Sequence, residues 1–385
     1  MSPLTPTRPA GPAAPAPAVE VDWDLAARWG GRLASPGPTR ARAELEQTVA
    51  SLHDAAVRAL PLALRAARLR PAVEASGRQD DVAQVLVVDR PGWMRAAGQS
   101  FDAMTSAAFG GGGGGQHAGP ADETSTGPAA RLAEGARSAP GTAQAAAVLS
   151  VLSSRVLGQF DPFAASAPVG GRLLLVAPNI LRMERLISAD PNDFRLWVCL
   201  HEQTHALQFA AAPWLAGYMR GQVGDLVHDL STTTPGGELG AALQAARRAL
   251  SRGDAGPAGL GLLELTLNPD QRRLVERLTA VMSLLEGHAD VAMDAVGPRT
   301  IPSVRRLRSR FDARRRHVTG IDRVLRRALG LDAKLEQYRR GAAFVREVRR
   351  TGGRKALDAV WSGPEALPTP AEIADPGAWV ERVHG

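Results

Sequence analysis

The residues His201-Glu202-Gln203-Thr204-His205 place two histidines four positions apart in a segment that should be helical. Residues Phe194 to Phe209 contain no glycine or proline, and Asp190-Pro191 ahead of them is a typical helix start. Because residues four apart share one face of a helix, both imidazoles can face one point with Glu202 beside them. Apolar neighbours predict that this helix is buried, so its polar side chains need partners. A metal ion would supply one; the alternative is a histidine pair satisfied by ordinary hydrogen bonds.

The HExxH spacing is typical of zinc hydrolases, and it predicts one zinc ion per chain. Catalytic zinc usually has three protein ligands and one open position, so a third ligand must lie outside the motif. A metzincin would continue with glycine and histidine where this chain has Gln208 and Ala211, which excludes that class. The third ligand is therefore expected from a more distant part of the chain.

A second helical run begins after Asn268 and continues to about Met293, and it carries Glu286, His288 and Asp290 near its end. Glu286 and Asp290 share one face of this core-facing helix, where a carboxylate is costly unless it is paired. His288 is an alternative third ligand. Since residues two apart point about 160° apart on a helix, only one of Glu286 and His288 can bind the metal. We favour Glu286.

Glu286 with Asp290 four residues later resembles the ExxxD helix of the gluzincins, the thermolysin-like zincins. This resemblance implies that His201, His205 and Glu286 bind zinc, and that Asp290 steadies a ligand histidine through a hydrogen bond. Leu285 departs from the pattern, because asparagine often precedes the glutamate in that helix.

The chain is also similar to a family of zincin-like hydrolases common in actinobacteria, often labelled as associated with deazaflavin coenzyme biosynthesis. The similar stretches are VLVVDRPGW (85–93), LLLVAPNI (173–180), FRLWVCLHEQTHALQF (194–209), LLEGHADVAMDAVG (284–297) and LPTPAEIADPGAWVERV (367–383). The similarity implies a zincin-like architecture, mainly α with a small β-sheet (α+β), and a metallopeptidase or other metallohydrolase activity.

The expected reaction is hydrolysis of a peptide or amide, with Glu202 as the general base that takes a proton from water. Tyr218, Tyr338 and His317 are candidates for stabilising the developing oxyanion, and the sequence does not choose among them. Residues 172–177 should form a strand, either an edge strand that pairs with an extended substrate or an interior one. The alternative function is a catalytically silent, metal-stabilised binding or scaffold protein. Glu202 favours catalysis, because structural zinc usually has four protein ligands and needs no base.

With 44% hydrophobic residues, a chain of 385 residues can bury a large core. We expect a disordered Pro/Ala-rich tail at 1–20 and a zincin-like catalytic domain over 21–385, with a helical C-terminal part at 300–385. A flexible low-complexity insertion is expected at about 105–142, where six glycines are consecutive. Shorter elements are expected as helices at 41–64 and 143–157, a strand at 85–88 and a helical lid or insertion at 235–259.

We expect a cytoplasmic protein that does not enter membranes. The N-terminus lacks the pattern of a secretory signal, no apolar run reaches the length of a membrane span, and Cys199 is the only cysteine. Cys199 is expected to be a small buried side chain. The net charge of +7 suggests binding to nucleic acid. Two features argue against nucleic acid as a partner: the basic residues are nearly all arginine, and aromatic residues make up only 4% of the chain. Residues 305–316 are therefore expected to be a solvated arginine-rich helix face, and the oligomeric state is left open.

Overall fold

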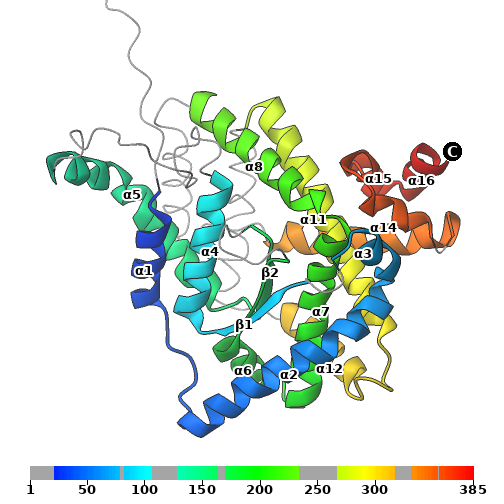
Figure 1. Ribbon diagram of the computed structural model, residues 1–385, viewed down its shortest axis with the longest axis horizontal. Coiled ribbons are helices and arrows are strands. Elements are labelled where there is room, and N and C mark those ends of the chain that lie inside the picture. Colours follow the sequence, from blue (N-terminus) through cyan, green and yellow to red (C-terminus); the bar gives the residue numbers. More distant parts are fainter. Residues whose placement is uncertain are drawn as a thin grey trace, which may run out of the picture.

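The computed structural model describes residues 21–78, 82–105, 128–163, 170–233, 267–316, 331–353 and 355–385. These residues form a mainly helical fold with one small three-stranded sheet near its centre (Figure 1), which confirms the fold class predicted from the sequence. The strands are β1 (Gln84–Val88), β2 (Gly158–Asp161) and β3 (Arg172–Val176). The helices are α1 (Trp23–Leu33), α2 (Arg42–Ala67), α3 (Arg70–Ala75), α4 (Arg90–Thr105), α5 (Pro128–Ser153), α6 (Ala177–Leu186), α7 (Pro191–Ala211), α8 (Trp214–Thr233), α11 (Pro269–Ala295), α12 (Val304–Arg316), α14 (Leu331–Thr351), η2 (Ala356–Trp361), η3 (Pro364–Ala366), α15 (Pro370–Ala374) and α16 (Pro376–His384).

Strand β3 lies in the middle of the sheet, whose order is β1-β3-β2. It pairs in parallel with β1 and antiparallel with β2. All five residues of β3 are buried, as expected for a strand covered on both faces. Residues 172–176 are therefore an interior strand, and the possibility that this segment forms a substrate-binding edge was wrong. The two edges of the sheet belong to β1 and to β2, a short strand that was not predicted from the sequence.

The two faces of the sheet pack against different sets of helices. Leu174 and Val176 of β3 contact a cluster contributed by α1, α4 and α5. Leu173 and Leu175, which alternate with them, belong to the larger core around α2, α7, α11 and the C-terminal helices. Figure 1 shows α1, α4 and α5 on one side of the sheet and α2 and α7 on the other. Helix α7, which carries the HExxH motif, thus packs against one face of the sheet and lies inside the larger core.

Helices α7 and α11 begin where the sequence predicted, because polar side chains cap them. The Asp190 carboxylate accepts a hydrogen bond from the Asp193 backbone N–H at the start of α7. At the start of α11, the Asn268 side chain accepts from the backbone of Gln271, and the Gln271 side chain accepts from the Asn268 backbone. A proline occupies the first turn of both helices.

The flexible insertion predicted at about 105–142 was wrong in its second part, which belongs to helix α5. It begins at Pro128, so residues 128–142 are helical, because they are rich in alanine and proline is favoured at a helix start. The six glycines of the insertion, the predicted tail at 1–20 and the predicted lid at 235–259 lie outside the described residues.

Helices α11 and α14 cross with their backbones in direct contact at two glycines. A Cβ atom at Gly287 would overlap the backbone of Gly341, and a Cβ atom at Gly341 would overlap the carbonyl of Ser283. Only a residue without a side chain allows this close approach. Because Gly287 follows Glu286, the crossing also sets where that carboxylate lies.

The crossing yields a stability prediction. We expect Gly287→Ala to lower the free energy of unfolding by about 1–3 kcal/mol or more, because the new methyl group must push two helices apart. Urea unfolding followed by circular dichroism measures this change. Gly221→Ala is the matched control, since a Cβ atom there meets nothing within 4 Å and alanine favours the helix. Equal midpoints for the two variants would contradict the role assigned to the crossing.

Candidate metal centre

Three side chains from two helices converge on one point. His201 and His205 of α7 and Glu286 of α11 each offer a ligand atom, and these atoms lie within 4.8 Å of one another. The two Nε2 atoms of the histidines are 3.2 Å apart. Glu286 places one carboxylate oxygen 3.7 Å from Nε2 of His201 and the other 3.8 Å from Nε2 of His205. The structure thus brings together the three residues that the sequence analysis selected.

The Nδ1 atoms of His201 and His205 both lie beside hydrogen-bond acceptors, which leaves a lone pair on each Nε2 atom. Nδ1 of His205 lies 2.9 Å from Oε1 of Gln208. Nδ1 of His201 lies 3.2 Å from Sδ of Met293. Since an amide oxygen and a thioether sulfur only accept hydrogen bonds, we assign the proton of each ring to Nδ1. The two Nε2 lone pairs and the Glu286 carboxylate then face one another with no proton to share.

The orientation of Gln208 is itself determined by its surroundings. Its Nε2 donates to the Leu285 carbonyl, 2.8 Å away, and lies 3.1 Å from Nδ1 of His288. The other nitrogen of His288, Nε2, lies 3.1 Å from the Ala67 carbonyl and must donate to it. Nδ1 of His288 is therefore an acceptor, the amide nitrogen of Gln208 faces it, and the amide oxygen faces His205.

His288 thus does not reach the ligand cluster, although the sequence left it as an alternative third ligand. It is 1% exposed, both of its nitrogens have partners in the core, and its ring lies 5.2 Å from that of Trp361. Burial lowers the pKa of His288 to about 3, so it is neutral at physiological pH. The structure brings Glu286, and not His288, to the two histidines.

Asp290 does not hold a ligand imidazole, contrary to what the gluzincin resemblance implied. Its carboxylate pairs with Arg308 of α12 at 2.5 Å, and Arg346 lies at 4.0 Å. The hydrogen bond expected from Asp290 is made to His205 by Gln208 instead, which lies one turn farther along α7. Asp290 points to the arginine-rich helix because α12 packs beside the end of α11, a contact that spacing in α11 alone does not reveal.

Glu202 lies beside the cluster and is 6% exposed. Burial and the nearby negative charge of Glu286 raise the pKa of Glu202 to about 8, while a hydrogen bond from the Phe160 backbone N–H acts in the opposite direction. A cation held at the cluster would also lower this pKa. Glu202 is therefore a carboxyl whose proton affinity the site adjusts, as a general base requires.

Gly158 of β2 makes the position of Glu202 possible, and the sequence analysis missed it. A Cβ atom at Gly158 would lie 2.6 Å from Cγ of Glu202 and 2.9 Å from Oε1. No local pattern marks this glycine, because its role depends on how β2 packs on α7. Gln208, also missed, does carry a signal, since a polar residue three positions after His205 on a buried helix needs a partner.

The donor set fits a metal ion. Ligand atoms around tetrahedral zinc, with bonds of about 2.0–2.2 Å, lie roughly 3.3–3.6 Å apart, close to the separations of 3.2, 3.7 and 3.8 Å found here. Two lone pairs and a carboxylate this close repel one another unless a cation lies between them. Ordinary hydrogen bonds, the alternative reading of the histidine pair, leave this repulsion in place.

Of the three candidates for stabilising the oxyanion, Tyr218 is the one whose side chain the structure describes. Tyr218 contacts Trp214 on α8, with ring centroids 6.2 Å apart, and His317 lies outside the described residues. Tyr338 lies on α14 in a part whose side chains are not described. Cys199 is 0% exposed and its Sγ faces the Leu52 carbonyl, as expected for a buried thiol.

Among the described side chains of the arginine-rich helix α12, Arg308 and Arg310 have partners in the protein. Arg308 pairs with Asp290 and Asp294. Arg310 donates to the carbonyls of Ile187 and Ser188. These two cations thus hold α12 against the neighbouring helices.

A mainly helical fold that carries an HExxH helix and a glutamate from a second helix at one metal-binding point is the arrangement of a zincin. Comparison with known proteins agrees: the profile of the zincin-like metallopeptidase family matches residues 21–380, so the chain belongs to this family. No curated protein matches the chain significantly. Among the described helices, none combines the length and the apolar composition that a membrane span requires.

A solved structure resembles most of the chain. It comes from Chloroflexus aurantiacus and is described as “a putative hydrolase with a novel fold”. The two share 29% sequence identity and a TM-score of 0.59, over 94% of this chain and 98% of that one. The distribution in actinobacteria and the link to deazaflavin coenzyme biosynthesis stay predictions from the sequence.

The hydrogen-bond arrangement around His205 predicts which residues affect metal affinity. We expect Gln208→Leu to weaken zinc binding by about 10–100-fold, the usual effect of losing the hydrogen bond that orients a ligand histidine. Asp290→Asn should leave the affinity unchanged, because Asp290 pairs with Arg308. Competition with a chromogenic chelator measures both. Weaker binding in Asp290→Asn than in Gln208→Leu would restore the role that the gluzincin resemblance gave to Asp290.

Proposed function

We propose that the protein is a zinc-dependent hydrolase that cleaves peptide or amide bonds. In this proposal His201, His205 and Glu286 bind one zinc ion per chain, and Glu202 is the general base. The observation that carries it is the meeting of two imidazole lone pairs and a carboxylate beside a second, buried carboxylate.

The chemistry of the donor set favours zinc. Two imidazole nitrogens and one carboxylate suit zinc, whereas magnesium and calcium prefer oxygen ligands throughout. Three protein ligands leave a coordination position for water or substrate, as in catalytic rather than structural sites. When bound, zinc supplies Lewis acidity that polarises a carbonyl and makes water more acidic.

Glu202 supplies the proton transfer. Its carboxylate takes a proton from the attacking water and passes it to the nitrogen that leaves when the carbon–nitrogen bond breaks. The Phe160 backbone N–H holds the carboxylate in place. The alternative of a silent binding or scaffold protein gives no reason to keep a second carboxylate buried beside Glu286, where the two negative charges repel each other.

The substrate in this proposal lies along β2. An edge strand can pair with an extended peptide through its backbone, and β2 is the edge strand that approaches Glu202. Such pairing would place a substrate carbonyl over the metal-binding point. The described hydrolase character of the Chloroflexus aurantiacus protein is consistent with this reaction class.

Substitution of the two glutamates separates metal binding from catalysis. We expect Glu202→Gln to keep about one zinc per chain and to lower hydrolysis of a peptide library by about 10²–10⁴-fold, the usual contribution of a general base. Glu286→Ala should lose zinc, because only two protein ligands remain. Elemental analysis and mass spectrometry of the library give the two readouts. A zinc-loaded wild-type protein that cleaves no peptide or amide would favour the binding-protein alternative.

Gly158→Ala tests the position of the base without changing its chemistry. The added methyl group would displace Glu202, and a shift of about 1 Å can cost on the order of 100-fold in rate. We therefore expect kcat to fall by about 10–100-fold while the zinc content stays unchanged. Gly224→Ala is the control, since its Cβ atom meets nothing within 4 Å. Unchanged kcat in Gly158→Ala would show that β2 does not constrain Glu202.

A further inference from the structure

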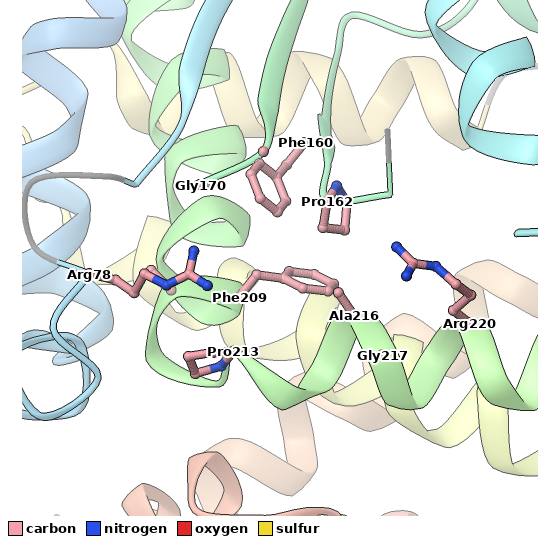
Figure 2. A pocket seen from close by; sticks show the side chains of 11 residues that line it. Arg78, Phe160, Pro162, Gly170, Phe209, Pro213, Ala216, Gly217 and Arg220 are labelled. Atoms are coloured by element: carbon pink, nitrogen blue, oxygen red, sulfur yellow. The ribbon is translucent and has the colours of Figure 1, made fainter. Parts of the chain in front are cut away.

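A cavity of about 260 Å³ opens between the end of α7, the start of α8 and strand β2. Apart from two arginines, its lining residues carry apolar side chains or are glycines. Figure 2 shows Phe160 and Pro162 on one side, Phe209 across from them and Ala216 on α8. The volume lies just below the roughly 300–1,000 Å³ of typical small-molecule pockets, so the cavity suits about one amino-acid residue.

Two arginines give this cavity a positive charge. Figure 2 shows the guanidinium groups of Arg78 and Arg220 pointing into the cavity from opposite sides. None of the described lining residues is acidic. The Nε atom of Arg220 is buried and has no hydrogen-bond partner among the described residues. Because buried donors are normally paired, this N–H is suited to a ligand that brings an acceptor.

The cavity adjoins the candidate metal centre. Phe209 lies one helical turn after His205 on α7, and a turn advances about 5.4 Å. The Phe209 ring lies 5.3 Å from that of Phe160, whose backbone N–H bonds to Glu202. Since an extended chain advances about 3.3 Å per residue, a substrate bound at the metal centre reaches the cavity with its next one or two residues.

Resting on the proposed hydrolase function, we propose that this cavity is a specificity pocket for a substrate that carries a carboxylate within one or two residues of the scissile bond. Arg220 binds the carboxylate, Arg78 adds a second positive charge at the cavity, and Phe160 and Phe209 contact the apolar part of the same residue. A guanidinium group binds a carboxylate through paired hydrogen bonds, which are among the stronger ones in proteins. The carboxylate is either the free C-terminus of a peptide or the side chain of Asp or Glu.

Binding is best measured without turnover, in zinc-loaded Glu202→Gln protein. The probes are N-acetyl-Ala-Phe as the free acid, N-acetyl-Ala-Phe amide and N-acetyl-Ala-Glu amide, each titrated by calorimetry. Each probe is also titrated into three versions that carry a second substitution. Arg220→Met removes one cation, and Ala216→Trp fills the cavity while keeping both arginines. Arg58→Met is the matched control, because Arg58 is an exposed arginine on α2.

We expect at least one acidic probe to bind about 10–100-fold more tightly than the Phe amide, as for other hydrogen bonds to charged groups. Arg220→Met should remove most of this preference, Ala216→Trp should abolish binding of the acidic probe, and Arg58→Met should change neither. Preference for the Phe acid identifies a C-terminal carboxylate, and preference for the Glu amide identifies an acidic side chain. If Arg220→Met fails to fold, the preference for the acidic probe is measured in Arg220→Lys and Ala216→Trp instead.

Equal binding of acids and amide, no binding of any probe, or an equal effect of Arg58→Met would overturn the pocket assignment. The proposed function is judged separately by cleavage in the protein with Glu202 intact. Cleavage at equal rates with and without the carboxylate would refute the proposed pocket and support the proposed hydrolase function. Binding that depends on the carboxylate, without any cleavage, would support the carboxylate-binding cavity and refute the proposed hydrolase function.

Discussion

A line of hydrogen bonds ties the candidate metal centre to the core. It runs from the Ala67 carbonyl through His288 and Gln208 to His205. Each member determines the proton position of the next, because a carbonyl can only accept. Gln208 also bonds to the Leu285 carbonyl, so the same line joins α7 to α11. The tautomer of His205 and the approach of Glu286 therefore depend on how three helices pack, and not on the HExxH segment alone.

The site concentrates negative charge in a buried place. Burial raises the proton affinity of Glu202, and the negative charge of the nearby Glu286 raises it further. Such an arrangement is unfavourable without a cation, and the two imidazole lone pairs provide the remaining ligands for one. The absence of a side chain at Gly158 lets β2 come close to Glu202. Strand, base and ligands therefore depend on one another sterically as well as electrostatically.

The regular elements were largely readable from the sequence. Capping residues and uninterrupted apolar periodicity located α7 and α11, and the run at Val85–Val88 located β1. The elements that were missed have weak local signals. Strand β2 has four residues, and α5 extends into a stretch whose glycine-rich beginning suggested low complexity. Asp290 was assigned by analogy, and its partner Arg308 lies on another helix whose packing no spacing rule predicts.

The sequence by itself determined that His201 and His205 share one face of a buried helix with Glu202 beside them, since a spacing of four residues has that consequence on any α-helix. It also narrowed the third ligand to Glu286 or His288. Only the tertiary structure decided between them, because the choice depends on the rotation of α11 against α7 and on the glycine contact with α14. It likewise put Gln208 where Asp290 was expected and opened an arginine-lined cavity beside the site, since both result from contacts between residues far apart in the chain.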